Sequence, residues 1–461
     1  MANIYSYTTG ICPTCRELVS ARIIENNDEI FLEKMCPAHG NQAHMVSSGK
    51  EWFEQSRAYV KPGQQPLRKA VSSFAGCPDS CGLCPEHRQH TCLPVAEITS
   101  RCDLNCPICL KDKNSRFSMS VDEYRFALKK LREAEGEILM VNLSGGEPLL
   151  HPQFTEFLRV GHEEGVMQTT VSTNGLKLFE DKKLREAFVK YKTIVCLQFD
   201  GFEPRTWLRL RGADLAAVKL ELIDMLESEG IAYTLTATAA AGVNRHEISA
   251  IVDFFFDRKA LSLMFQPAAY VGRASVFPAD EPRLTIYDVV REIEKSAYVG
   301  QGDFNPLPCS HHSCFALAYY IIIDEKNFLS LQDFLGRGKY LDIIANSTLP
   351  GLTQESHTIL KEHIYECWSA ADSGGNNARI LERLRAILRE ISKLDGTAFS
   401  PDKAFTLGRA NMKGVFVHHF MDTESFDLGR LIKCCNHYLQ PDGRLIPICA
   451  HNNSFKRSHE Q

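Results

Sequence analysis

The chain has 461 residues, of which 44% are hydrophobic, so it is long enough to bury a substantial core and to divide into two to four domains. A net charge of −5 and a pI near 6.4 exclude the broad basic surface typical of nucleic-acid binding. The chain starts without a signal-peptide pattern, and no apolar run approaches the roughly 20 residues that cross a bilayer. We therefore expect a cytoplasmic protein without a transmembrane segment, and we expect its 17 cysteines to bind metal rather than form disulfides.

Two knuckles near the start of the chain are joined by a predicted β-hairpin. The first contains Cys12 and Cys15, and the second contains Cys36 and His39. The run between them has apolar residues on both sides of an Asn-Asn-Asp turn. We predict a small metal-binding domain over residues 1–50 that holds zinc or, as in a rubredoxin, one iron, because so short a segment needs the metal for stability.

Residues 51–94 begin as a linker with Pro and Gly and then become rich in cysteine. They contain a Cys-x3-Cys-x2-Cys motif, and Cys92 follows closely as a fourth ligand. The predicted auxiliary iron–sulfur cluster has four protein ligands, Cys77, Cys81, Cys84 and Cys92.

A second Cys-x3-Cys-x2-Cys motif consists of Cys102, Cys106 and Cys109 and follows a predicted strand at 95–99. Three cysteines can each hold one iron of a [4Fe–4S] cluster, which leaves the fourth iron open to a substrate or cofactor. A zinc knuckle would need a fourth nearby Cys or His, which this loop lacks. We therefore predict a catalytic cluster here.

Strands and helices alternate between residues 95 and 275. This order predicts an α/β fold with a partial (β/α)6 barrel, in which functional residues gather at the C-terminal ends of the strands. The expected strands are 95–99, 138–143, 168–173, 193–199, 231–238 and 261–266, and the expected helices include 121–135, 154–164 and 215–229.

Polar and glycine residues follow these strands in turn. Asn174 and Asp200 each precede a glycine and could also be ordinary turn residues. Arg211 could hold an anionic group or lie on the surface. The residues that we expect at the carboxyl edge are Gly145, Gly146, Glu147, Ser172, Asn174, Gln198, Asp200 and Asn244.

The cysteine loop followed by Ser144-Gly-Gly-Glu-Pro148 resembles the radical S-adenosylmethionine (SAM) superfamily. The resemblance implies that Cys102, Cys106 and Cys109 are catalytic and that the residues at the carboxyl edge bind SAM. The two glycines would let the backbone approach the cofactor, and the Glu147 carboxylate would favour its cationic groups. Ser172 and Asn174 would form hydrogen bonds with its ribose or carboxylate.

Residues 276–461 contain further soft metal ligands. Cys309 and Cys314 come first, and a predicted hairpin at 441–443 brings Cys449 back beside Cys434. We predict a C-terminal auxiliary iron–sulfur domain on these four residues. Whether Cys434 or its neighbour Cys435 is the ligand is left open.

A narrower resemblance, over nearly the whole chain, is to the tetraether lipid synthases and the related methanogen pterin methylases. It rests on the opening knuckles, the two cysteine loops, Cys309 with Cys314, and the ending that runs from Phe420 to Cys449. This resemblance implies three [4Fe–4S] clusters, one mononuclear iron or zinc, and a reductant such as ferredoxin or flavodoxin.

Two reactions follow from this resemblance. The main hypothesis is C–C coupling of lipid hydrocarbon chains, which calls for a long apolar cavity and leaves peripheral membrane contact open. The alternative is methylation of a pterin or another small polar molecule, which calls for a polar pocket. A simple electron carrier is the weakest hypothesis, because it would not need a SAM site.

Overall fold

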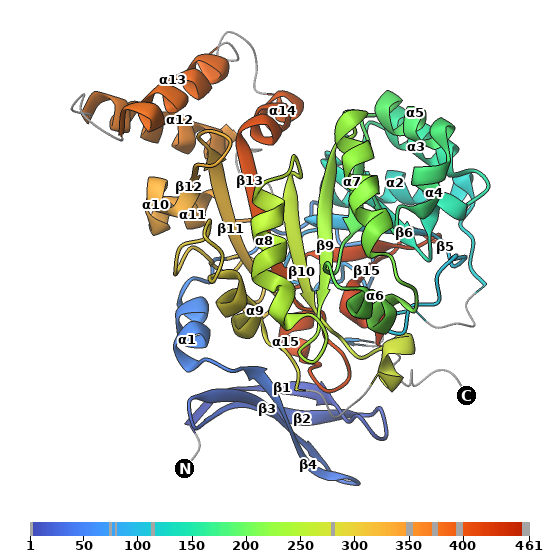
Figure 1. Ribbon diagram of the computed structural model, residues 1–461. Coiled ribbons are helices and arrows are strands. Elements are labelled where there is room, and N and C mark those ends of the chain that lie inside the picture. Colours follow the sequence, from blue (N-terminus) through green and yellow to red (C-terminus); the bar gives the residue numbers. More distant parts are fainter. Residues whose placement is uncertain are drawn as a thin grey trace.

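The computed structural model describes residues 3–72, 76–78, 81–111, 116–277, 282–346, 354–370, 377–392 and 400–453 (Figure 1). Two sheets organise them, a small antiparallel sheet at the N-terminus and a large, mostly parallel sheet. The fold is therefore mixed α/β, as the sequence predicts.

The N-terminal sheet has four antiparallel strands in chain order. The β2–β3 turn lies at Asn27 and Asp28, both with positive φ, which confirms the predicted hairpin. Ile30 and Leu32 are fully buried against Phe53 of helix α1 (Lys50–Ala58). The strands are β1 (Asn3–Ile11), β2 (Leu18–Asn26), β3 (Glu29–Cys36) and β4 (Gly40–Ser47).

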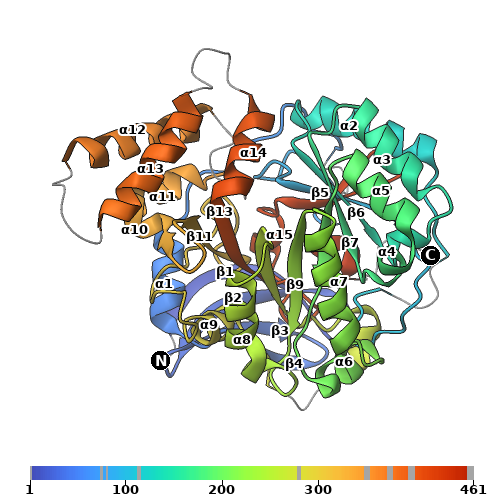
Figure 2. The ribbon, with the colours of Figure 1, turned by 45° about the horizontal axis from the view of Figure 1, so that its top comes forward.

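Six parallel strands form the centre of the large sheet, and each pairs with the next one along the chain. Helices cover their outer face (Figure 2). Each predicted strand lies within two residues of an observed one, and the prediction for 168–173 coincides with β7. The strands are β5 (Leu93–Thr99), β6 (Met140–Gly145), β7 (Gln168–Thr173), β8 (Ile194–Gln198), β9 (Tyr233–Ala239) and β10 (Ser262–Pro267).

The covering helices begin and end where the sequence signals indicate. Helix α2 starts at Ser120, whose side chain forms a capping box with Glu123, and it coincides with the predicted helix. The α-helices are α2 (Val121–Glu135), α3 (Phe154–Glu163), α4 (Leu176–Glu180), α5 (Lys182–Lys190), α6 (Pro204–Arg211), α7 (Ala216–Ser228) and α8 (Ile248–Phe256). The short 3-10 helices are η1 (Pro148–Leu150), η2 (Arg245–Glu247) and η3 (Gly272–Val276).

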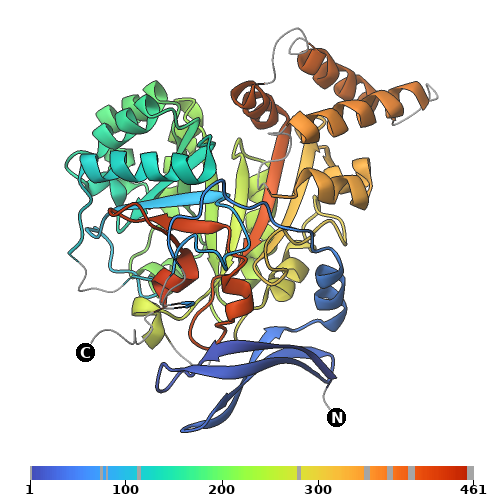
Figure 3. The same cartoon turned by 180° about the vertical axis from the view of Figure 1, so that it is seen from behind.

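Strands from the last third of the chain extend this sheet at both edges (Figure 3). β13 (Met412–His418) runs parallel to β10, and β14 (Asn436–Leu439) runs parallel to β5. Three antiparallel strands complete the edges: β11 (Phe315–Ile322), β12 (Phe328–Ser330) and β15 (Leu445–Pro447). The C-terminal segment thus shares one sheet with the barrel, and the boundary expected near residue 275 stays a prediction.

Helix α14 (Pro401–Asn411) covers the N-terminal ends of the strands. Its Phe405 is buried with Ile194 at the start of β8, beside Met140 and Leu261. Among the described residues, no helix is both long and apolar enough to cross a membrane. The remaining helices are α9 (Ile286–Ile293), α10 (Leu331–Leu335), α11 (Arg337–Ile343), α12 (Gln354–Ala370), α13 (Asn377–Ser392), α15 (Leu428–Leu431) and α16 (Ile448–Asn452).

Candidate active site and metal centres

A cavity of about 940 Å³ lies inside the barrel. It extends from the cysteine loop, at the carboxyl edge of the sheet, to α14 at the opposite edge. Most of the residues expected from the sequence line it together: Cys102, Cys106, Cys109, Gly145, Gly146, Glu147, Ser172, Asn174 and Gln198. The parallel sheet brings them together because each follows, or ends, a neighbouring strand.

The three cysteines of the catalytic loop differ in exposure. Cys102 is exposed, Cys109 is partly buried and Cys106 is buried. Burial raises the pKa of the Cys106 thiol. Cys102 is exposed as a residue, but protein atoms around its thiol desolvate it and raise its pKa to about 11. Because only thiolates ligate iron, a bound cluster must supply the positive charge that deprotonates these two residues. Three thiols that line one cavity fit a cluster with one open iron.

The glycine pair is required by the close approach of two backbone segments. A Cβ on Gly145, which has a φ of 135°, would lie 2.2 Å from the Thr99 carbonyl oxygen. A Cβ on Gly146 would lie 2.3 Å from the Arg101 carbonyl oxygen. The end of β6 is thereby pressed against the start of the cysteine loop, and Gly146 N donates to Thr99 O at 2.7 Å.

Glu147 ties two strand ends together. Its buried carboxylate accepts hydrogen bonds from Leu149 N at 3.1 Å, Thr173 Oγ1 at 2.8 Å and Asn174 N at 2.8 Å. Burial raises its pKa to about 7, although these three hydrogen bonds oppose the shift. Asn174 in turn donates Nδ2 to Asp103 Oδ1 of the cysteine loop at 2.6 Å. The loop is thus held in place from β7.

Asp200 and Asn244 lie behind the cavity wall. Arg211 donates Nε to Asp200 Oδ2 at 2.7 Å and Nη2 to Oδ1 at 2.8 Å. Burial favours a higher pKa for Asp200, but the charge and hydrogen bonds of Arg211 outweigh it and bring the pKa below the ordinary value. Asn244 donates Nδ2 to the carbonyl oxygens of Asp200 and Thr238, each at 2.7 Å. Both predicted cofactor residues therefore support the site from outside the cavity.

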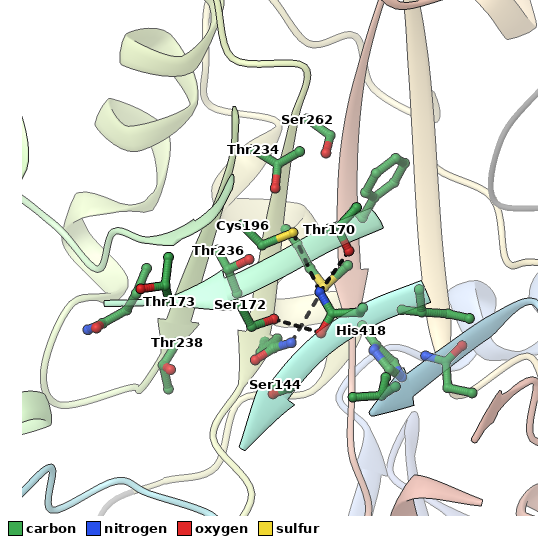
Figure 4. Close-up of a pocket in the computed structure, with 18 of the residues that line it drawn as sticks. Ser144, Thr170, Ser172, Thr173, Cys196, Thr234, Thr236, Thr238, Ser262 and His418 are labelled. Atoms are coloured by element: carbon green, nitrogen blue, oxygen red, sulfur yellow. Dashed lines mark hydrogen bonds between the residues drawn. The ribbon is translucent and has the colours of Figure 1, made fainter. Parts of the chain in front are cut away.

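The sequence analysis assigned a role only to Ser172 from a group of hydroxyl side chains that line the barrel interior (Figure 4). Asn142 connects part of the group, donating to Thr170 Oγ1 at 2.8 Å and accepting from Ser172 Oγ at 3.0 Å. The signal was present, because polar residues occupy every second position of β7 and β9. The group consists of Ser144, Thr170, Ser172, Thr173, Thr234, Thr236, Thr238 and Ser262.

The C-terminal strands add an aromatic side to the cavity. Phe315 of β11 stacks on His418 of β13 with ring centroids 4.0 Å apart. Burial lowers the pKa of His418 to about 3, so its ring is neutral at ordinary pH. Tyr319, Phe416 and Phe420 line the same cavity. The cavity thus combines hydrogen-bonding groups with flat apolar surfaces.

The predicted N-terminal metal ligands converge. The ligand atoms of Cys12, Cys15, Cys36 and His39 all lie within 4.8 Å of one another. His39 Nδ1 is 3.6 Å from Cys12 Sγ and 3.4 Å from Cys36 Sγ, and the Sγ atoms of Cys15 and Cys36 are 3.9 Å apart. Ligand bonds of about 2.0–2.3 Å in a tetrahedron require such separations, so the site fits one zinc ion.

The auxiliary cysteines come together around β14, and their division into two sets of cluster ligands stays a prediction. β14 lies beside β5, so Cys92 N donates to Cys435 O at 2.8 Å, and the Cys92 thiol is in hydrogen-bonding reach of Cys309 and Cys435. Cys434 interacts electrostatically with Cys314 and Cys449 and also with Cys435, so the second group adjoins the first at this pair of residues. Cys77 and Cys81 pack against the apolar cluster that contains Cys449. Cys84 is also buried, and it lies eight residues before Cys92 in the chain.

Comparison with known proteins finds two family models that match parts of this chain and one relative that matches nearly all of it. Residues 4–48 match the family model of the HMPTM N-terminal zinc ribbon domain, and residues 96–255 match that of the radical SAM superfamily. A 7,8-dihydro-6-hydroxymethylpterin dimethyltransferase of Methanocaldococcus jannaschii is 27% identical, over 98% of this chain and 94% of the relative.

Other similarities cover a smaller share of the chain. A GTP 3',8-cyclase of Erythrobacter litoralis is 28% identical over 34% of this chain and 48% of its own length. The crystal structure of Streptococcus suis SuiB bound to its precursor peptide SuiA superposes with a TM-score of 0.39 and 18% identity, over 45% of this chain and 46% of SuiB.

Proposed function

This chain is an enzyme of the radical SAM superfamily, and we propose that it transfers methyl groups to a pterin or a closely similar polar heterocycle. The full-length similarity to a pterin dimethyltransferase supports this reaction over the lipid coupling that the sequence analysis ranked first. The main hypothesis is thus replaced by its alternative.

The observation that carries the proposal is the group of hydroxyl and amide side chains on the barrel wall next to the cysteine loop, in a cavity whose lining is otherwise mostly apolar. A pterin presents several ring nitrogens and an amino group at its edge, which pair with hydroxyl and amide side chains such as those of Thr170, Thr236 and Asn142. The faces of its rings would stack on aromatic side chains such as Phe315 and Phe420. Alkyl chains would form no hydrogen bonds with these side chains.

Cys102, Cys106 and Cys109 would hold the [4Fe–4S] cluster, and Gly145, Gly146, Ser172, Asn174 and Gln198 would bind SAM. When bound, this pair supplies radical chemistry that the side chains themselves lack. The protein orients the two ligands in one cavity and excludes water from it. The cavity volume of about 940 Å³ is at the upper end of the range for small-molecule sites, which is about 300–1,000 Å³.

The remaining metal sites support this centre. The zinc ribbon would hold one zinc on Cys12, Cys15, Cys36 and His39. We assign auxiliary iron–sulfur clusters to the two cysteine groups that flank β14, one around Cys92 and the other around Cys449. Ferredoxin or flavodoxin remains the expected reductant.

The test is anaerobic incubation of the reconstituted enzyme with SAM, a reductant and 7,8-dihydro-6-hydroxymethylpterin. Mass spectrometry should show a methylated pterin with the wild-type protein and none with the Cys106→Ala variant, which removes one cluster ligand. Lipids from cells that express each form are the control. Coupled lipids together with unaltered pterins would contradict the proposal and support the lipid-coupling hypothesis instead.

A further inference from the structure

A buried ion pair lies directly behind the cysteine loop. Arg211 holds Asp200 through two hydrogen bonds and also donates to Thr238 Oγ1 at 2.9 Å. The Asp200 side chain is completely buried, and that of Arg211 is 13% exposed. Gln198 Nε2 and Thr238 N donate to the same carboxylate at 2.6 and 2.9 Å. These contacts hold the guanidinium in one position.

The C-terminal end of α6 carries Arg211 to the cysteine loop. Ile108 N donates to Leu210 O at 3.3 Å, and a Cβ on Gly212 would lie 3.5 Å from the carbonyl oxygen of Asn105. Both neighbours of Arg211 thus contact the loop. Gly212 has a φ of 78°, a left-handed conformation that ends the helix at this point and suits glycine.

Arg211 and the three cysteines of the loop line the same cavity. The Arg211 side chain is close enough to Cys106 to interact with its thiol electrostatically and through a hydrogen bond. By contrast, the charged neighbours of Cys102 are the carboxylates of Asp103 and Glu147. Reduction of a cluster adds one negative charge, which a nearby cation and a hydrogen bond to a ligand sulfur both stabilise.

We propose that Arg211 is a positioning residue that raises the reduction potential of the cluster on the cysteine loop through its hydrogen bond to Cys106 Sγ. Asp200 has two effects, because it fixes the guanidinium and its negative charge offsets part of that of Arg211. The step concerned is the uptake of one electron by the cluster from an external reductant, before any bond in SAM breaks.

The proposal predicts shifts of opposite sign for the two partners. Arg211→Gln removes the positive charge, so we expect the ratio of reduced to oxidised cluster at a fixed potential to fall about tenfold, which is about 59 mV for one electron. Asp200→Asn keeps an acceptor for the guanidinium but removes the offsetting charge, so the potential should rise. Arg211→Lys keeps the charge but loses the planar donor geometry, so the fall should be smaller.

The experiment uses the full-length, anaerobically reconstituted protein. Iron and sulfide contents are measured first, and a redox titration then follows the electron paramagnetic resonance signal that changes when SAM is added, which identifies this cluster among the others. Arg209→Gln is the matched control, because Arg209 lies on the same helix, is exposed and contacts the Gly242 carbonyl. Its potential should equal that of the wild type.

Two results would overturn the proposal. One is a shift in the same direction in Arg211→Gln and Asp200→Asn, which would indicate general damage to the site. The other is an unaltered reduction potential in both Arg211→Lys and Asp200→Asn. These two variants decide the question even if Arg211→Gln assembles no cluster, which could happen because that substitution leaves Asp200 buried without its partner.

Discussion

The zinc ribbon and the auxiliary cysteine groups, to which we assign metal sites, are assembled over very different lengths of chain. In the ribbon a single hairpin brings Cys12 and Cys36 together. In the auxiliary groups, Cys92 and Cys435 meet because β14 pairs with β5. A site closed by a local turn can be predicted from residue spacing, whereas a site closed by a distant strand pair depends on the topology of the sheet.

The largest effect is expected when the local site is broken. Cys36→Ser should unfold residues 3–47, because a structural zinc contributes about 10–16 kcal/mol of binding free energy in zinc-finger peptides. Zinc analysis and limited proteolysis measure this loss. Cys196→Ser is the control, because Cys196 lies outside every metal group described, and this variant should retain its zinc and its resistance to proteolysis. A resistant ribbon in the Cys36 variant would show that its own small core suffices.

The distant site is tested by comparing two adjacent residues. Cys435→Ser should lower the iron content by about four atoms, one cluster, because Cys435 lies with Cys92 and Cys309. Cys434→Ser should affect the other group, with Cys449. Iron analysis of the two variants and their double variant separates the groups. Full iron content in Cys435→Ser would contradict the grouping seen in the structure and favour the one expected from the sequence.

A smaller effect concerns the carboxylate that supports the catalytic loop. The pKa of Glu147 is raised from 4.5 to about 7, so the folded state binds more protons than the unfolded state between these pH values. Stability should therefore fall as pH rises from 4.5 to 7, by about 3 kcal/mol from this group. Glu147→Gln should flatten the slope, as measured by urea unfolding at several pH values. A slope equal to that of the wild type would show that another group is responsible.

The smallest effect is expected from the hydroxyl lining. Thr236→Val removes one hydrogen-bonding group without changing the side-chain shape, and a hydrogen bond contributes about 0.5–1.5 kcal/mol. The KM for the pterin should rise about two- to tenfold while cleavage of SAM continues. Thr406→Val on α14, an exposed threonine, is the control. An unaltered KM would place the substrate away from β9.

Most of the barrel could be predicted because its signals are local. Alternating strands and helices, the capping box at Ser120 and the glycine turn at Gly175 each act over a few residues. The contribution of β13 and β14 could not be predicted, because their partner strands β10 and β5 lie far away in the sequence. Asp200 was expected in the cavity for a different reason: its partner Arg211 is close in the sequence, but their pairing depends on how α6 packs against the sheet.

The sequence by itself determined the kinds of metal ligand, the order of the strands and the residues at their carboxyl ends, because spacing and periodicity are properties of neighbouring residues. Only the tertiary structure decided which cysteines meet, which polar residues face the cavity and which lie behind it. These outcomes depend on contacts between segments up to several hundred residues apart, and such contacts are selected by the packing of the whole sheet rather than by any local pattern.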